Sequence, residues 1–452
     1  MPRTKSVSRL RRHRATRRTR RGGTVIGEGG YGCVIRPAVA CQGNQAFAGN
    51  DAYVSKIIHF QDAGEEMEQA GAVRDMLESN PEIPAHFFSI PEVSCGFQLG
   101  ALADNDRRDC RAIRGQDPNQ FQVLQSQYGG RELRSFFREV VAGTQSLDAL
   151  SLVTANMLEM LDEAILPMNR YGIWHCDLKP QNILVHPETG GVTMIDWGMM
   201  KTRAELDELG PDAWHFMWNA PFVGTMIKGI EQAGRPFLLT RDDVRTIMTG
   251  QGSYDDLGNH LSISPVRGRD YRRTVLDSIG HLVYTMTTIR NALRVLDLAN
   301  EPDNVFQLID NYQNGAIAVM NGNEAPTNEI TDAQRERLRN WFFENVDKWG
   351  FVCSFTPLFD SRDPNISRPA AEAFIYMFTT TMRQGEVEMP GGASPAGINP
   401  EILTVMLGRY IQEQRPLYGE PMEEGGGKKA RGKKTRGKKA RGKKRRSTRR
   451  RQ

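Results

Sequence analysis

The sequence predicts an α+β fold with a two-lobed core. Alternating apolar residues flank a glycine-rich segment near residue 30, which is typical of strands joined by a turn. Farther along, apolar residues recur at helical spacing, for example over residues 62–77 and 275–298. A chain of 452 residues that is 39% hydrophobic can bury a core in both lobes, and we expect the folded part to extend from about Thr24 to Gly419.

The first strands surround residues 26–34, IGEGGYGCV, which fit the pattern G-x-G-x-x-G-x-V. Four residues make this fit: Gly27, Gly29, Gly32 and Val34. Glycines let backbone N–H groups approach phosphates, although glycine-rich hairpins without a ligand are common. The strand Tyr53–Ile57 follows and carries Lys56, where a strand lysine is otherwise usually a solvated surface charge.

A helix is predicted over Asp62–Leu77 from its apolar spacing, with Met67, Ala70, Val73 or Arg74, and Leu77 on one face. Its first turns carry three neighbouring glutamates: Glu65, Glu66 and Glu68. Farther on, residues 121–137 read as an apolar strand that breaks at Gly129-Gly130 and leads into a helix.

The most informative stretch is His175–Asn182, HCDLKPQN, which the segment Met194–Gly198, MIDWG, follows. It supplies the polar groups that phosphoryl transfer needs: Asp177, Lys179, Asn182 and Asp196. One group orients the attacking hydroxyl, one neutralises the moving phosphoryl group, and two hold a metal ion. Residues 183–185 and 192–195 read as a hairpin with a Pro- and Gly-containing turn. A polar loop before a Trp-bearing strand would explain either motif alone.

These motifs, in this order and spacing, resemble those of eukaryotic-type serine/threonine protein kinases. The resemblance implies a bilobal fold with a small β-rich N-lobe and a larger, mostly helical C-lobe, and the use of ATP and Mg²⁺. It implies that Asp177 is the catalytic base, that Lys179 contacts the γ-phosphate, and that Asn182 and Asp196 hold Mg²⁺.

In the N-lobe, the resemblance implies that the glycine segment covers ATP, with Val34 over the adenine, and that Lys56 contacts its α- and β-phosphates. A helix glutamate should hold Lys56. We favour Glu66 over its two neighbours, although a helix dipole alone would also select acidic residues there. Residues 121–137 resemble a haspin-like hinge, with Leu124 as gatekeeper and the backbone of Gln125 to Tyr128 against the adenine. A plain strand–turn–helix explains the same letters almost as well.

Two positions depart from the kinase pattern: Cys176 replaces the arginine before the base, and Trp197 replaces a phenylalanine. Activation-loop phosphates usually pair with that arginine. Between Met199 and Ala220, Thr202 is the single hydroxyl acceptor, so we predict activity that does not depend on phosphorylation there. We expect Cys176 to be buried and inert rather than redox-active.

The match is looser in the C-lobe. Residues 220–222, Ala-Pro-Phe, stand where A-P-E is usual, without the glutamate. Residues 345–350 resemble the start of the large C-lobe helix, in which Asp347 would brace the catalytic loop. The long interval before them, about 225–340, is predicted to be a helical insertion without an assigned role.

Charge is unevenly distributed along the chain. Residues 1–23 hold ten Lys/Arg and residues 425–452 hold sixteen, without any acidic residue, while the part between holds 33 basic and 54 acidic residues. The C-terminal run repeats every five residues (GKKAR, GKKTR), has nothing to bury, and is predicted to be disordered when free. We expect these arms to bind DNA or another polyanion, with nuclear targeting or contact with the acidic body as alternatives.

Other compositional features limit the cellular location. No run of about 18 apolar residues is present, so no transmembrane helix is expected, and the Arg-rich N-terminus lacks the apolar segment of a secretory signal. Six cysteines without metal-binding spacing suggest reduced thiols in a cytosol-like compartment. They are Cys33, Cys41, Cys95, Cys110, Cys176 and Cys353.

The hinge, the Trp218–Phe222 stretch, residues 345–350 and the Arg-rich leader together resemble the divergent kinases of nucleocytoplasmic large DNA (giant) viruses. That resemblance implies a virion-packaged kinase, found in the virion or in the host cytoplasm or nucleus, monomeric, and acting on protein substrates. The predicted division is a basic arm (1–23), an N-lobe with hinge (24–128), a C-lobe (129–419) and a basic tail (420–452).

Two other function classes remain open. A small-molecule kinase of the aminoglycoside or choline type shares H-x-D and I-D-W, but Lys179-Pro180 and the full glycine segment argue against it. A catalytically silent kinase-fold protein that packages DNA would normally have lost Lys56, Asp177 or Asp196. ATP·Mg²⁺ binding distinguishes that class from an active kinase.

Overall fold

The structure is a computed structural model, which describes most of the chain between Gly23 and Gly408. The described residues are 23–28, 32–43, 46–98, 100, 102, 104–206, 220–263, 270–298, 302–322, 329–379, 404–405 and 407–408. Gly29 of the glycine segment, nearly all of the N-terminal arm and the whole C-terminal tail therefore lie outside the described residues.

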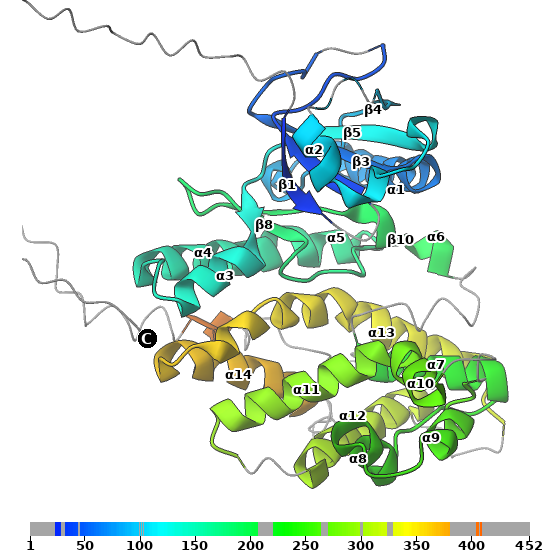
Figure 1. The fold of residues 1–452 in the computed structure, drawn as a ribbon. Coiled ribbons are helices and arrows are strands. Elements are labelled where there is room, and N and C mark those ends of the chain that lie inside the picture. Colours follow the sequence, from blue (N-terminus) through cyan, green and yellow to red (C-terminus); the bar gives the residue numbers. More distant parts are fainter. Residues whose placement is uncertain are drawn as a thin grey trace, which may run out of the picture. The chain divides into compact units, whose positions relative to one another are not determined.

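The N-terminal half forms an antiparallel sheet of five strands in the order β1-β2-β3-β5-β4 (Figure 1). The strands are β1 Thr24–Glu28, β2 Gly32–Arg36, β3 Tyr53–His59, β4 Val93–Gly96 and β5 Phe121–Gln127. Strand β3 pairs with β5 along its whole length and with β2 over residues 55–58, and this register sets Lys56 opposite both Val34 and Leu124. The predicted strands on both sides of the glycine segment are confirmed.

Helix α1, Phe60–Ser79, packs against this sheet and confirms the predicted helix. Its buried face carries Ala63, Glu66, Ala70, Val73 and Met76. Glu66 thus points inward, while Met67 is only half-buried. A carboxylate on the buried face needs a cationic partner, which the next subsection describes. A short helix, α2 Asp104–Asp109, lies in the long connection between β4 and β5.

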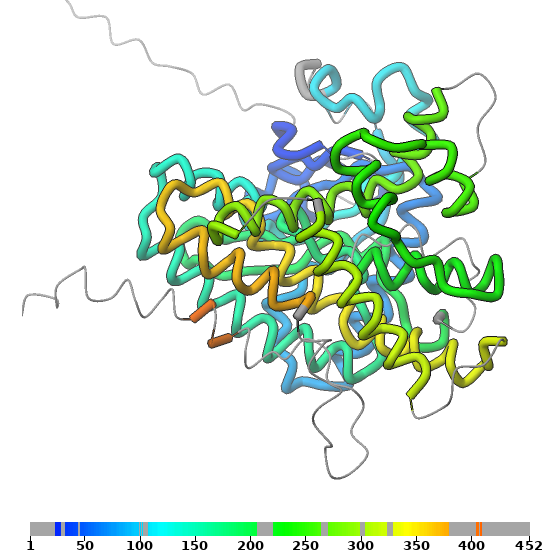
Figure 2. Tube along the Cα trace, turned by 90° about the horizontal axis from the view of Figure 1, so that it is seen from below, coloured from blue at the N-terminus to red at the C-terminus, as the bar shows by residue number. Residues whose placement is uncertain are grey.

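The remaining described residues are mostly helical (Figures 1 and 2). After β6 (Arg131–Glu132), the chain forms α3 Leu133–Val141 and α4 Leu147–Met160, and a π-helical turn joins α4 to α5 Leu166–Arg170. The later helices are α6 Arg203–Leu206, α7 Pro221–Ala233, α8 Arg241–Thr249, α9 Tyr254–His260, α10 Tyr271–Ser278, α11 Gly280–Val295, α12 Pro302–Asn321, α13 Asp332–Cys353 and α14 Pro364–Thr379. Helices α7–α12 occupy the interval in which we expected a helical insertion, and α11 packs along α14.

Short strands between these helices build the floor of the site. Strands β8 Ile183–Val185 and β9 Val192–Met194 form the predicted hairpin, and β6 pairs with β8. Strand β7 Ile173–Trp174 pairs with β10 Lys201–Thr202. The architecture, a small antiparallel sheet with one packed helix followed by a helical part, is the predicted α+β, kinase-like bilobal fold.

Two features of the fold correct the sequence-based expectations. Residues 345–350 do not begin the large C-lobe helix, because α13 already starts at Asp332, where Thr331 and Gln334 form a capping box. The expectation of six reduced thiols is also wrong. Cys33 is bonded to Cys110 and Cys41 to Cys95, across sequence separations of 77 and 54 residues.

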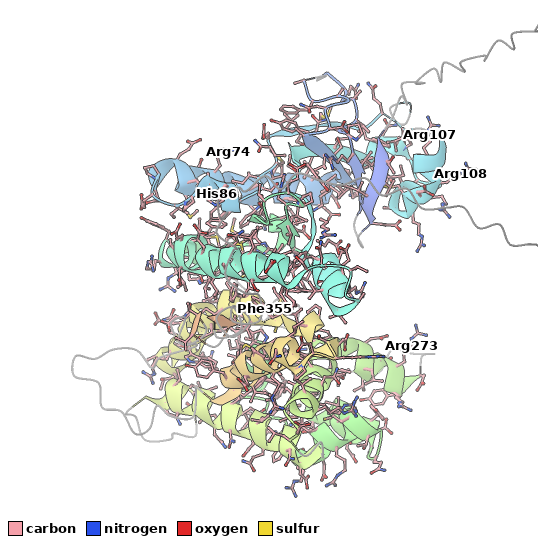
Figure 3. The ribbon with its side chains drawn as sticks, turned by 90° about the vertical axis from the view of Figure 1, so that its left-hand side faces the viewer. Arg74, His86, Arg107, Arg108, Arg273 and Phe355 are labelled. Atoms are coloured by element: carbon pink, nitrogen blue, oxygen red, sulfur yellow. A yellow bond between two sulfur atoms is a disulfide. The ribbon has the colours of Figure 1, made fainter. Side chains whose placement is uncertain are left out.

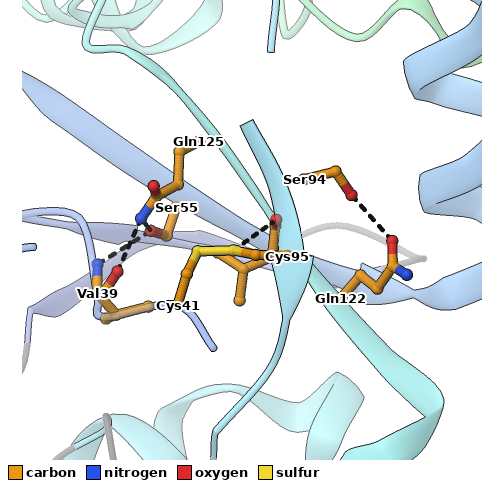
Figure 4. The surroundings of a disulfide bond; sticks show 8 residues. Val39, Cys41, Ser55, Ser94, Cys95, Gln122 and Gln125 are labelled. Atoms are coloured by element: carbon orange, nitrogen blue, oxygen red, sulfur yellow. Dashed lines mark hydrogen bonds between the residues drawn. A yellow bond between two sulfur atoms is a disulfide. The ribbon is translucent and has the colours of Figure 1, made fainter. Parts of the chain in front are cut away.

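Both disulfides belong to the N-terminal half and lie in its apolar core. Sheet pairing explains the second one, because an isolated bridge between Gln42 and Gly96 brings its two segments together. Figure 4 shows that bond beside the buried hydrogen bond from Gln125 to the Val39 carbonyl. No spacing rule reveals pairs that are so far apart in sequence. Among the described helices, none is long and apolar enough to cross a membrane.

Candidate active site

Lys56 joins the two halves of the site. Its Nζ lies 2.6 Å from Oε2 of Glu66 on α1 and 2.8 Å from Oδ1 of Asp196, which follows β9. Of the three candidate glutamates, Glu66 is therefore the one that the structure brings to Lys56. The Asp196 side chain keeps 40% of its surface exposed, so it can contact both the lysine and a ligand.

The charged groups of this cluster shift one another's pKa values. Burial lowers the pKa of Lys56, but the charges of Asp196 and Glu66 outweigh burial, so the pKa is raised above its ordinary value. Burial raises the pKa of Asp196, yet the charge and hydrogen bond of Lys56 bring it below the ordinary value. For Glu66, burial prevails over Lys56 and its pKa is raised. Lys56 and Asp196 thus remain charged near neutral pH.

The residues of the predicted catalytic loop form a second cluster around Asp177. Oδ2 of Asp177 accepts hydrogen bonds from Lys179 Nζ (2.6 Å) and from Nδ2 of Asn182 (2.9 Å). Oδ1 of the same carboxylate is buried and has no hydrogen-bond partner among the described residues. A buried acceptor without a donor is costly unless a ligand supplies the donor, so this oxygen is suited to receive a hydroxyl proton.

A buried carboxylate from α13 holds the backbone of this loop. Asp347 is fully buried, and its oxygens accept bonds from the backbone N–H groups of His175 and Cys176, both at 2.9 Å. It also accepts a bond from Nδ2 of Asn169 at 2.8 Å. Asp347 therefore holds the backbone of the predicted catalytic loop, as expected, whereas Asn169 was not predicted, because 178 residues separate it from its partner.

The contacts of Trp197 explain why a tryptophan can replace the phenylalanine of the kinase pattern. Its ring stacks on Phe88, with centroids 5.8 Å apart, and contacts the ring of His175 at 4.8 Å. Its Nε1 donates to the carbonyl of Ser89 at 3.0 Å. An indole thus fills the place of a phenyl ring and adds a hydrogen bond that ties the turn after Asp196 to the segment before β4.

The residues beside the catalytic groups have unusual backbone conformations. Cys176 has φ 59° and Asp196 has φ 69°, in the left-handed region that side-chain-bearing residues seldom adopt. Such strain persists where surrounding contacts fix it, here the bonds to Asp347 and Lys56. Cys176 is buried and its burial raises the pKa of the thiol well above the ordinary value, as expected of an inert cysteine.

The hinge residues lie differently from the expectation. The Gln125 carbonyl already accepts from the Glu92 N–H (2.8 Å), and the Tyr128 N–H donates to the Ala52 carbonyl (2.8 Å). The Gln127 carbonyl also accepts a bond, from the Ser89 hydroxyl at 3.5 Å, so an adenine ring would have to displace existing bonds to use this backbone. Leu124 is buried opposite Lys56, in the position expected of a gatekeeper.

Glycines are required at two points near the site. A Cβ at Gly32 would collide with the carbonyl of Ile57, and a Cβ at Gly130, whose φ is +118°, would collide with the carbonyl of Val185. Gly27 is less restricted, because a Cβ there would make ordinary contact with Val34.

The donor set fits a magnesium ion. Nδ2 of Asn182 is engaged with Asp177, so its amide oxygen is the atom left to bind a metal. The backbone bond from Ile195 N–H to Asn182 O brings that residue beside Asp196. Carboxylate and amide oxygens are the ligands Mg²⁺ prefers. Within the described chain no cluster of three or more His, Cys, Asp or Glu could hold a metal without other ligands, so phosphate oxygens and water would complete its shell.

Comparison with known proteins supports the same chemistry. The model of the APH phosphotransferase enzyme family matches residues 124–241. This stretch starts in β5, includes the catalytic loop and Asp196, and ends at the start of α8. No curated protein matches the chain. The fold is consistent with a kinase-like protein, and the family match supports both that assignment and phosphotransfer as the activity.

Proposed function

We propose that this protein transfers the γ-phosphate of ATP to serine and threonine hydroxyls of proteins. One observation carries the proposal: the buried Oδ1 of Asp177 lacks a donor in the described chain, while Oδ2 is held by Lys179 and Asn182. A substrate hydroxyl would donate its hydrogen bond to Oδ1 and pass its proton there as the phosphoryl group arrives. Lys179, beside the same carboxylate, would offset the negative charge of that group.

The other residues have positioning roles in this mechanism. Lys56, oriented by Glu66, would bind the α- and β-phosphates. Asn182 and Asp196 would hold Mg²⁺, which neutralises charge on the phosphates when bound. Asp347 and Asn169 would keep the loop in place. We infer activity independent of Thr202 phosphorylation, because its hydroxyl already donates to Glu205 Oε2 at 2.8 Å.

A second candidate is a small-molecule kinase, which the APH family match favours, since that family includes phosphotransferases acting on small molecules. Lys179 and the glycine segment favour the protein kinase. The two differ in acceptor: one would phosphorylate proteins, the other an aminoglycoside or an alcohol such as choline.

The test is transfer of labelled γ-phosphate from ATP·Mg²⁺ to the chain itself, to a basic protein, and to aminoglycosides and choline. Asp177→Asn should reduce transfer by at least about 10²-fold, as for loss of a general base. Asp277→Asn, an equal charge change at a 62% exposed site on α10, is the matched control. Labelling of the small molecules alone would replace the first candidate by the second, and absence of labelling with any acceptor would leave a silent, packaging role.

We further propose that the two basic arms bind DNA or another polyanion, in keeping with a virion-packaged kinase. Their 26 Lys/Arg residues support this. If about ten of them neutralise phosphates, affinity should fall with salt at a log–log slope near −9. Fluorescence anisotropy with a duplex at several salt concentrations measures the slope, and a salt-independent affinity would contradict the proposal. The arms also contain Ser6, Ser8, Thr16, Thr19, Thr435, Ser447 and Thr448, whose phosphorylation would weaken binding by subtracting charge.

A further inference from the structure

The β1–β2 hairpin borders the glycine segment on both sides. Residues 29–31 lie outside the described residues, but Glu28, which ends β1, lies opposite Cys33 of β2 in the antiparallel register. Within the described sheet, β1 is an edge strand that pairs only with β2, and its register is irregular near the middle of the strand. Pairing alone therefore holds this end of the hairpin weakly.

Two consecutive residues of the connection between β4 and β5 bind the two strands at this end. Cys110 is disulfide-bonded to Cys33. The next residue, Arg111, donates its backbone N–H to Oε1 of Glu28 at 2.6 Å. Both strands are thus attached to the same short segment at the point where they meet the residues of the glycine segment.

That connecting segment is itself anchored in the protein. Leu102, Cys110 and Ile113 are buried in the apolar core of the N-terminal half. Figure 3 shows α2, marked by Arg107 and Arg108, beside β1, with which it is in contact. A segment fixed in this way can hold the end of an edge hairpin in one place.

The two attachments lie on the sheet face that points away from the expected nucleotide contacts. Residues directly opposed in antiparallel strands share a face, and successive residues alternate between faces. The register opposes Val34 to both Gly27 and Lys56, so these three residues share one face. Glu28 and Cys33 are opposed to each other and share the other face. They would therefore act on a nucleotide through the hairpin, without touching it.

We propose that Glu28, Cys33, Cys110 and Arg111, here called the hairpin clamp, are positioning residues that raise the affinity for ATP by fixing the β1–β2 hairpin. The inference rests on the proposed use of ATP. The covalent bond and the charge-assisted backbone bond carry it, because the Arg111 guanidinium is 81% exposed and 3.6 Å from the Glu28 carboxylate. Where the fixed hairpin is only partly populated, the apparent Kd rises by the inverse of its population.

The first test is calorimetric titration of the full chain with ATP·Mg²⁺. Replacing Cys33 and Cys110 by serine should raise Kd by about tenfold, equivalent to ordering about one more backbone residue on binding. Replacing Cys41 and Cys95 by serine is the matched control. It opens a loop of 54 rather than 77 residues in the same core, so it should lower Tm by a similar amount and leave Kd unchanged.

The second test separates the backbone bond from the exposed ion pair. Glu28→Ala removes the acceptor and should raise Kd by at least about threefold, although losing a negative charge near a triphosphate would by itself lower Kd. Glu28→Gln keeps an acceptor oxygen and should restore at least the affinity of the wild type. Arg111→Gln keeps the backbone N–H and should change Kd by at most about twofold. In the weakened variants, KM for ATP should rise while kcat changes little.

Two outcomes of the titrations would overturn the proposal. One is an equal rise in Kd for both pairs of cysteine variants, which would make the Cys33–Cys110 bond a general contribution to stability. The other is an unchanged Kd in both the Cys33/Cys110 variant and Glu28→Ala.

A wild type that binds no ATP·Mg²⁺ would refute the proposed function, and hydrogen exchange of residues 24–36 then tests the clamp without ligand. Exchange should accelerate in the Cys33/Cys110 variant and in Glu28→Ala, but not in the Cys41/Cys95 variant. Unchanged exchange in the first two variants would overturn the clamp.

Discussion

Replacing Asp347 by asparagine tests the brace beneath the catalytic loop. The fully buried carboxylate accepts three hydrogen bonds, from His175 N–H, Cys176 N–H and Asn169 Nδ2. In Asp347→Asn one oxygen becomes an NH₂ donor. The less costly orientation keeps the oxygen toward His175 and Asn169 and leaves the Cys176 N–H without an acceptor.

Loss of one bond to a charged acceptor, with its donor left buried, costs about 1.5–3 kcal/mol. Part of this cost is offset, because burial raises the pKa of Asp347 against the opposing charge of His175 and the bonds from Asn169 and the loop backbone. Burying that charge is therefore unfavourable, and the substitution removes it. We expect a net loss of about 1–2 kcal/mol, which lowers Tm by about 2–6 °C.

The effect on catalysis should be larger than the effect on stability. A small displacement of the loop misplaces Asp177 against its substrate, and we expect a fall in phosphotransfer rate of about 10–100-fold. Thermal unfolding and labelled phosphate transfer measure the two effects, with Asp277→Asn as the matched control. If Asp347→Asn keeps both the Tm and the rate of the wild type, the bonds to the loop backbone do not position the base.

Three further predictions concern other contacts. Lys56→Met should leave Glu66 and Asp196 without their cation and reduce the rate of labelled phosphate transfer by about 10²-fold or more. An unchanged rate would show that Lys56 takes no part in the mechanism. Replacing Cys41 and Cys95 by serine opens a 54-residue loop and should lower the free energy of unfolding by about 4 kcal/mol, measured in denaturant. If a thiol-reactive probe labels both cysteines in the native wild type, the disulfide is absent. Lys56 lowers the pKa of Asp196 despite burial, so the stability that Asp196 contributes is present above its ordinary pKa of 3.8 and is lost as pH falls through the lowered value. The Tm difference between wild type and Asp196→Asn should therefore shrink in acid. A difference that grows in acid would contradict the lowered pKa.

The parts of the site that are local in sequence could be predicted. Residues 175–182 and 194–198 are short motifs whose hydrogen bonds, such as Lys179 to Asp177, form within a few residues. The hairpin between them follows from turn residues and apolar strands. The strands around the glycine segment follow from alternation in the same way.

Rotation and length of helices were harder to predict. The apolar spacing of residues 62–77 places Met67 on the buried face, whereas the structure buries Glu66, because Lys56 compensates a charge there. Residues 345–350 contain a motif but no helix start. The start lies at Asp332, and the capping box of Thr331 and Gln334 was the signal for it.

Contacts between distant segments could not be predicted from one sequence. Asn169 meets Asp347 across 178 residues, and the four bonded cysteines have no diagnostic spacing. Such pairs become visible only when the fold brings the segments together.

The position of the disulfides has a consequence for how the protein responds to its surroundings. Cys33 lies next to Gly32 in the strand that leaves the glycine segment, and both disulfides belong to the half that would hold ATP. Cys176 and Cys353, in the catalytic half, are free thiols. A chain made under reducing conditions would have its catalytic half in final form and its nucleotide half without covalent ties. The stability of the N-terminal half would thus depend on whether its cysteines are oxidised, so preparations from reducing and oxidising hosts need not be equivalent.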